Sequence, residues 1–145
     1  MTCAFCDDKN LTLRTIYKDE LVMAFPSTAS IVAGHTLVCP LRHVEKVDDL
    51  SEGELKSIKD FIVQLKEAMK KCLGAEGFNI AWNEGEKAGQ SVSHLHIHVL
   101  PRKGGDTGIY EYEPRKFLYR TDFESRKLPG IEELQEISHL IKNSL

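Results

Sequence analysis

SVSHLHIHVLP, residues 91–101, places a histidine at every second position: His94, His96 and His98. Successive side chains of an extended strand point to opposite faces, so these three imidazoles are predicted to share one face. The apolar residues between them fill the other face. The segment therefore predicts a strand with one face on the hydrophobic core and an imidazole face toward a cleft or a second layer.

The imidazole row alone allows three interpretations. The first is an exposed face without function. The second is a metal site, because alternating histidines can give two ligands to one ion. The third is a nucleophile for covalent catalysis. The preceding loop, NEGEKAGQS (residues 83–91), bears on the choice. Gly89 lets backbone N–H groups approach an anion, and Asn83 and Ser91 can donate hydrogen bonds to phosphate oxygens. An anion-binding loop beside an imidazole favours chemistry at phosphorus.

The segments around this strand predict an α+β fold. Connections between the predicted strands are short, which favours a mainly antiparallel sheet of about five strands. The strands are predicted over residues 14–17, 21–25, 35–40, 77–83 and 94–101.

A long helix is predicted over residues 51–73. Ser51 and Glu54 form a capping-box pair at its start, and Gly74 provides the C-terminal stop. A second amphipathic helix ends the chain, and residues 103–129 between the helices show no regular period. The predicted buried stripes are Leu55, Ile58, Ile62, Leu65 and Met69 in the first helix, and Ile131, Leu134, Ile137 and Ile141 in the second.

Composition restricts the class of protein. The 145 residues fit a single domain, and the net charge of −3 gives no broad attraction to nucleic acid or to an anionic membrane. No apolar run approaches the length of about 20 residues that a membrane span needs. The N-terminus lacks the pattern of a secretory signal, so we expect a cytoplasmic protein whose four cysteines are thiols or metal ligands. Cys3 and Cys6 have the spacing of half a tetrahedral zinc site, whereas Cys39 and Cys72 are expected to be buried.

HLHIHVL (residues 94–100) matches the His-φ-His-φ-His-φ-φ motif, with φ hydrophobic, of the histidine triad (HIT) nucleotide hydrolases and transferases. The resemblance extends to CAFC (3–6), AGHTLVCPLRHVEKVDDL (33–50) and NEGEKAGQSVSHLHIHVLPR (83–102). It covers residues 1–102 of a single domain and leaves 103–145 as a divergent extension. The resemblance implies an HIT-like fold, an antiparallel sheet with one long helix and a C-terminal helix, in a homodimer that joins two sheets.

The resemblance also implies roles for residues. His96 is the nucleophile that attacks the α-phosphorus of a nucleotide, His98 binds the phosphate oxygens, and Ser91 assists the leaving group. His35 supports the triad from behind. The positions implied to bind the nucleotide are Phe5, Phe25, Ser27, Asn83, Gly89, Gln90, Ser91, His96 and His98. The implied ligands of a structural Zn²⁺ are Cys3, Cys6, His43 and His94.

Two features distinguish branches of the family. The third histidine disfavours the uridylyltransferase branch, whose motif ends in glutamine. The tail lacks the Trp-Pro-rich ending of the phosphoramidase branch and contains RKFLYR (residues 115–120). The resemblance is nearest to the fragile histidine triad branch, which hydrolyses diadenosine polyphosphates, in a zinc-containing microbial form with an adenine nucleotide as ligand. The alternatives are a purine nucleoside phosphoramidase and a zinc-stabilised nucleotide-binding module with little turnover.

Overall fold

A computed structural model describes residues 2–106 and 128–145. Its strands form one antiparallel sheet in the order β1-β2-β3-β5-β4. Most of the segment 103–129, with the RKFLYR stretch, lies outside the described residues. The strands are β1 (Tyr17–Lys18), β2 (Val22–Pro26), β3 (Thr36–Pro40), β4 (Gly77–Ala81) and β5 (Ile97–Arg102), and the helices are α1 (Ala4–Asp7), α2 (Glu52–Leu73) and α4 (Ile131–Lys142).

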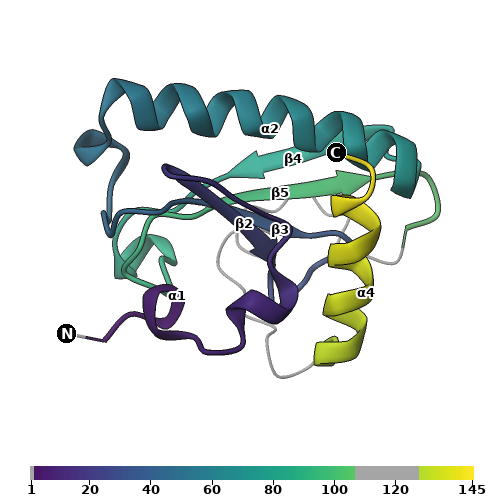
Figure 1. The fold of residues 1–145 in the computed structure, drawn as a ribbon, viewed down its shortest axis with the longest axis horizontal. Helices are drawn as coiled ribbons and strands as arrows, with labels where there is room; N and C mark the ends of the chain where they lie inside the picture. The colour runs from purple at the N-terminus through teal and green to yellow at the C-terminus, as the bar shows by residue number, and fades with distance from the viewer. Residues whose placement is uncertain (1, 107–127) are drawn as a thin grey trace.

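Both faces of the central strands are covered. Helix α2 lies along one side of the strands, and α1 with the N-terminal segment lies on the other (Figure 1). Alternate residues of each strand therefore enter different cores. The α2 side contains Val22, Ala24, Val38, Ile97 and Val99, and the N-terminal side contains Met23, Phe25, Leu37 and Cys39. Because Leu37 pairs with both Phe25 and His98, the histidine shares the N-terminal side.

Two strand predictions need correction. Residues 11–14 form a 3₁₀ helix, so the strand predicted over 14–17 is reduced to β1. The Thr15 hydroxyl closes this helix by donating to the Leu11 carbonyl (2.7 Å). The strand predicted from His94 begins at Ile97, because the Leu95 N–H donates to the Val44 carbonyl (2.7 Å) and not to a neighbouring strand.

The ends of α2 are confirmed. Ser51 and Glu54 form the reciprocal capping box, and Gly74 adopts φ +66° at the C-terminus, a conformation that glycine favours. Ile58, Leu65 and Met69 are buried as predicted, and Ile62 packs against the core. Leu55 is wrong, because it is 50% exposed, and Phe61 is buried in addition to the predicted residues. In the first turn the buried position is occupied by Glu54.

Three large hydrophobic side chains at the edges of the fold are exposed. Phe78 of β4 packs against the core on the α2 side, but Ile80 and Trp82 are 43% and 47% exposed because β4 is an outer strand of the sheet. In α4, Leu134 and Ile141 are buried as predicted, whereas Ile131, in the first turn, is 44% exposed. No helix within residues 2–106 or 128–145 is long and apolar enough to cross a membrane.

An ion pair between the exposed Arg42 side chain and the buried Glu54 carboxylate fixes the start of α2. The Arg42 guanidinium donates to both carboxylate oxygens of Glu54, at 2.8 and 3.2 Å, and to the Asp49 carbonyl at 2.8 Å. The Ser51 N–H donates to the same carboxylate at 2.9 Å. The bonds from Arg42 are the main cause that lowers the pKa of Glu54 from 4.5 to about 2. This pair connects the loop after β3 to the first turn of α2.

We expect Glu54→Gln to lower the free energy of unfolding by about 1–2 kcal/mol near neutral pH, because the bonds to charged groups are weakened. The folded-state pKa of Glu54 is depressed, so its contribution is present above about pH 4.5 and is lost as the pH falls toward about 2. Urea denaturation at about pH 7 and about pH 3 should therefore show a smaller difference from wild type in acid. Glu52→Gln, an exposed glutamate in the same turn, is the control. A difference from wild type that does not change with pH would contradict the assignment.

Candidate active site and metal cluster

The imidazole face lies beneath the N-terminal segment. His94, His96 and His98 are all buried, with exposed fractions of 0%, 4% and 9%. The Phe5 ring contacts two of them edge-on, with centroids 5.8 Å from His94 and 5.1 Å from His96. The shared face is therefore confirmed, and the interpretation that this face is exposed is wrong.

A hydrogen bond to the backbone sets the tautomer of His96. Its Nδ1 lies 2.7 Å from the His94 carbonyl oxygen, and a carbonyl only accepts hydrogen bonds. Nδ1 therefore carries the proton, and in the neutral ring Nε2 carries the lone pair. An imidazole with a lone pair on Nε2 can act as a nucleophile or as a base.

The tautomer of His98 is opposite and is set through His35. The Ile31 N–H donates to His35 Nδ1 (3.0 Å), so the neutral His35 ring carries its proton on Nε2. His35 Nε2 lies 2.9 Å from His98 Nδ1 and donates to it. The proton of neutral His98 is then on Nε2. His35 is fully buried.

The two rings thus offer complementary groups at one place. The His96 and His98 centroids are 5.0 Å apart, with their planes inclined by 63°. His96 presents a lone pair at Nε2, and His98 presents an N–H donor at Nε2. A nucleophile beside a hydrogen-bond donor is an arrangement that can attack a phosphoryl or acyl centre while binding its oxygen.

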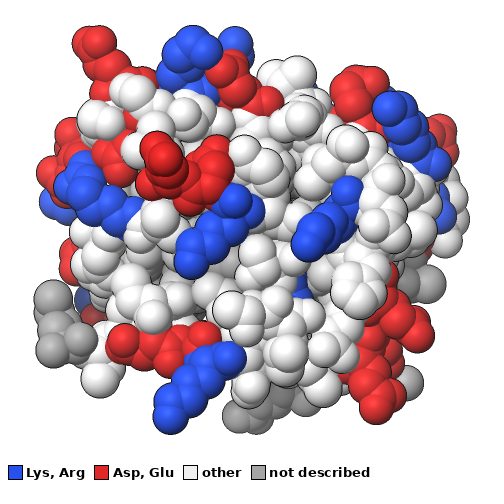
Figure 2. Space-filling view, in the orientation of Figure 1, with Lys and Arg blue, Asp and Glu red and all other residues white. Residues whose placement is uncertain are grey.

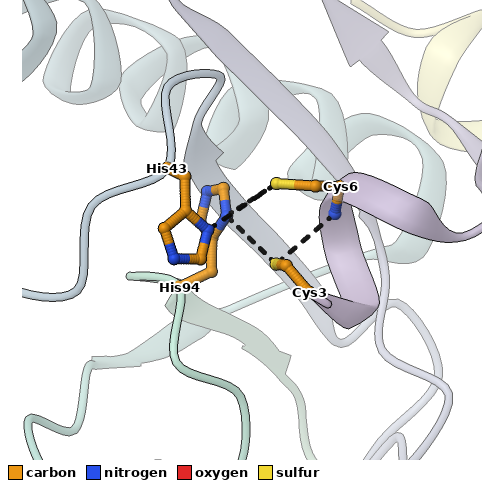
Figure 3. A group of neighbouring side chains, drawn as sticks. All are labelled: Cys3, Cys6, His43 and His94. Carbon is orange, nitrogen blue, oxygen red and sulfur yellow. Dashed lines mark hydrogen bonds between the residues drawn. The ribbon is translucent and has the colours of Figure 1, made fainter. Parts of the chain in front are cut away.

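His94 takes part in a cluster of possible metal ligands. Its Nε2 donates to the Pro40 carbonyl (2.8 Å), which leaves the lone pair on Nδ1. Cys3, Cys6 and His43 converge on that atom (Figure 3). The Sγ atoms of Cys3 and Cys6 each lie 3.6 Å from His94 Nδ1, and Cys6 Sγ lies 3.7 Å from His43 Nδ1.

These distances fit a tetrahedral metal site. Zinc bonds of roughly 2.3 Å to sulfur and roughly 2.0–2.1 Å to nitrogen place the two ligand atoms about 3.6 Å apart. All four ligand atoms lie within 4.8 Å of one another. The cluster can therefore hold a metal ion with little movement of its side chains.

The protonation of the cluster is coupled to metal binding. Burial is the main cause that raises the pKa of the Cys6 thiol to about 11, with the neighbouring Cys3 and the Asp7 charge adding to it. Burial also lowers the pKa of His94, which favours the neutral ring that ligates metals. A cation entering the cluster therefore displaces thiol protons.

The loop before β5 is held by side chains predicted to contact phosphate. Gln90 accepts from the Gly85 N–H (2.7 Å) and donates to the Glu45 carbonyl (3.1 Å). Asn83 is buried and donates to the Ala88 carbonyl (2.7 Å). Gly89 has φ +92°, which agrees with the need for glycine there. In this structure Gln90 and Asn83 shape the loop.

The remaining residues predicted to bind the nucleotide are Ser91, Ser27 and Phe25. Ser91 is exposed at the end of the loop. Ser27 is buried, and its hydroxyl oxygen accepts from the Ala29 N–H (3.2 Å). Phe25 is fully buried, with its ring centroid 5.1 Å from that of Phe5. Phe5, not Phe25, is the ring that contacts the histidines.

One carboxylate at the site was not anticipated. Glu84 accepts from the Val47 N–H (2.9 Å) and from the Trp82 indole N–H (3.1 Å). It connects the loop before β5 to the segment that follows His43. A glutamate in a polar loop carries no sequence signal for such a bond, because its partner is 37 residues away.

The chain matches the HIT domain model over residues 8–105 and belongs to this family. An uncharacterized HIT-like protein of Methanocaldococcus jannaschii is 38% identical over 112 residues, which cover 76% of this chain and 86% of that protein. A bis(5'-adenosyl)-triphosphatase of Dictyostelium discoideum is 29% identical over 122 residues, covering 84% and 78%.

Solved structures agree with the fold. A zinc-bound histidine triad family protein of Mycobacterium smegmatis superposes with a TM-score of 0.74 at 27% identity, covering 99% of this chain and 93% of that chain. The predicted α+β HIT-like fold with an antiparallel sheet is confirmed.

We expect nitrogen-15 NMR of the imidazoles near neutral pH to resolve two tautomers. His96 should be protonated on Nδ1, because this atom donates to a backbone carbonyl. His35 and His98 should be protonated on Nε2, because the Nδ1 atom of each accepts a hydrogen bond. The exposed His139 is the control and should average between forms. Protonation of His96 on Nε2 in the neutral ring would contradict the proposed arrangement.

Proposed function

We propose that this chain is a nucleotide hydrolase or transferase that acts on nucleoside 5′-phosphoryl compounds through a nucleotidyl-histidine intermediate. The complementary tautomers of His96 and His98 carry the proposal. His96 Nε2 forms a bond to the α-phosphorus, and the bond from phosphorus to the leaving-group oxygen breaks. Water then attacks phosphorus, the P–N bond breaks, and a nucleoside monophosphate is released.

The backbone bond of His96 favours this step electrostatically. When Nε2 bonds to phosphorus the ring becomes positive, while Nδ1–H continues to donate to the His94 carbonyl. A hydrogen bond from a charged donor is stronger than the same bond from a neutral one. The fixed carbonyl therefore stabilises the developing charge without rearrangement.

The other predicted residues act on the substrate's oxygens and leaving group. His98 Nε2–H donates to a phosphoryl oxygen, with its ring held by His35. Ser91 gives a proton to the departing oxygen. Backbone N–H groups around Gly89 bind the phosphates, in a loop shaped by Gln90 and Asn83.

We propose an adenine nucleotide as ligand and a diadenosine polyphosphate as first-choice substrate. The relative from Dictyostelium discoideum, a bis(5'-adenosyl)-triphosphatase, supports this choice. Phe5 offers an aromatic surface near His96, and Ser27 lies at the end of β2. We assign the nucleoside to this side, and the phosphates to the loop before β5.

We propose Zn²⁺ in the Cys3, Cys6, His43 and His94 cluster. A zinc-bound family member among the similar structures supports this identity, together with the ligand distances. Bound zinc would supply a structural cross-link between the N-terminal segment and His94. Because His94 also provides the carbonyl for His96, the cross-link would steady the nucleophile.

We also propose a cytoplasmic homodimer. Strand β4 is at the end of the sheet and exposes Ile80 and Trp82, which supports pairing of two sheets along this edge. The described cysteines are thiols, which supports a reducing compartment. Lysine and arginine are interspersed with acidic residues on the face in Figure 2, so that face gives no reason to include nucleic acid among the partners.

We expect His96→Ala to lower turnover of diadenosine triphosphate by at least about 1000-fold, because the nucleophile is removed. AMP affinity should change by less than about tenfold, or about 1.4 kcal/mol. His139→Ala, on the exposed side of α4, is the control. Appreciable turnover by His96→Ala would contradict the role of His96.

A parallel assay of wild-type protein with an adenosine phosphoramidate distinguishes a phosphoramidase from a diadenosine polyphosphate hydrolase. AMP binding without turnover of either compound would indicate a binding module.

We expect the purified protein to contain about one zinc ion per chain, measured by elemental analysis. Cys6→Ser should lower the zinc content and the thermal unfolding temperature, because one ligand is lost. Cys72→Ser, half-buried and outside the cluster, should leave the zinc content unchanged. Wild-type protein without zinc after purification in its presence would contradict the zinc site.

A further inference from the structure

A charged side chain is buried beside the proposed nucleoside side of the site. The side chain of Arg14 is only 6% exposed. Burying a charge is unfavourable unless hydrogen bonds and an opposite charge compensate it. Arg14 has three such contacts: a hydrogen bond to the Pro26 carbonyl, an ion pair with Asp8 (3.1 Å), and a position 5.0 Å from the centroid of the Phe25 ring.

The Pro26 carbonyl is where β2 ends and the segment that leads to His35 begins. The next residue, Ser27, donates its N–H to the His35 carbonyl (2.9 Å). The Ser30 hydroxyl donates to the Ser27 carbonyl (2.6 Å). Segment 27–35 is thus closed on itself by hydrogen bonds, and the bond from Arg14 fixes its first end.

The Asp8 contact reaches the opposite wall. Asp8 directly follows α1, the helix that carries Phe5. The Phe5 ring contacts Phe25 at 5.1 Å and His96 at 5.1 Å, both edge-on. A single guanidinium therefore contacts the N-terminal segment through Asp8, and the end of β2 through Pro26 and Phe25.

We propose that Arg14 is a positioning residue of the nucleoside subsite, which sets the spacing between the Phe5 wall and the Ser27 turn. The inference rests on the proposed function, because it assigns the nucleoside to these walls. Arg14 does not contact the reacting atoms, so it acts on nucleoside affinity and leaves the chemical step unchanged.

The geometry requires arginine at this position. A planar guanidinium donates in two directions within its plane while its face lies over an aromatic ring. A lysine ammonium retains the charge but lacks the planar fork that serves Pro26, Asp8 and Phe25 together. Arg14→Lys is therefore expected to show a defect even though the charge is preserved.

The test compares a nucleoside-containing probe with a phosphate-only probe. Inhibition constants of AMP and of inorganic phosphate, and the kcat for diadenosine triphosphate, are measured for wild type, Arg14→Met and Arg14→Lys. We expect AMP affinity to fall by about tenfold in both variants. Phosphate affinity and kcat should stay within about twofold of wild type.

Ser138→Ala is the matched control. The buried Ser138 hydroxyl of α4 shares its one proton between the carbonyls of Leu134 (2.6 Å) and Arg14 (2.9 Å). This change therefore removes a contact to the backbone of Arg14 and leaves its guanidinium contacts in place. Its AMP affinity should stay close to wild type, although its thermal unfolding temperature falls. Should Arg14→Met fail to fold, Arg14→Lys and Asp8→Asn provide the same comparison.

Three outcomes overturn the inference. AMP affinity equal to wild type in the Arg14 variants overturns it alone and leaves the proposed function intact. Equal weakening of AMP and phosphate, matched by Ser138→Ala, reduces Arg14 to a purely structural role. Wild-type protein that neither binds AMP nor turns over the substrate overturns the proposed function and this inference together.

Discussion

The hydrogen bond from His96 Nδ1 to the His94 carbonyl is the interaction on which the site depends. It exists because that carbonyl does not take part in the sheet: the ladder between β3 and β5 starts only at Ile97. A regular strand from His94 onward would direct this carbonyl toward a neighbouring strand. The irregular start of β5 therefore converts a backbone acceptor from a sheet component into a support for the reactive ring.

His94 connects the two chemistries of the imidazole face. Its backbone holds the His96 ring, and its own ring faces the cysteines through Nδ1 while Nε2 bonds to Pro40. Displacement of His94 would therefore disturb the proposed metal site and the proposed nucleophile at once. On the other side, His35 sets the proton position of His98 through one fully buried ring. Tautomers, not distances alone, distinguish three histidines that look equivalent in the sequence.

Local signals in the sequence predicted the features that depend on neighbours in the chain. Ser51, Glu54 and Gly74 defined the ends of α2, and the alternation in residues 94–100 placed the imidazoles on one face. The prediction errors arose where residues from another part of the chain determine the local structure. The bond from Leu95 to Val44 delays the start of β5, and in the first turn of α2 Glu54, paired with Arg42, is buried while Leu55 is exposed.

In the candidate site, too, local sequence patterns predicted what depends on neighbouring residues and missed what depends on distant ones. The spacing of Cys3 and Cys6 indicates half a metal site, but His43 joins it only because a loop folds back beside His94. Arg14 gave no signal at all, because a single arginine among apolar residues is usually solvated. Its burial depends on Asp8 and on the end of β2, which no local pattern specifies.

The cluster also determines when the molecule can be completed during synthesis. Cys3 and His94 are 91 residues apart, so Cys3 can join the cluster only after the chain up to His94 has been synthesised. The entropy lost on closing a loop grows with its length, and an ion bound in the cluster would restrict the unfolded chain over the same distance. The N-terminal segment that covers the imidazoles is therefore made before the residues it covers, and it can pack on them only once they have been made.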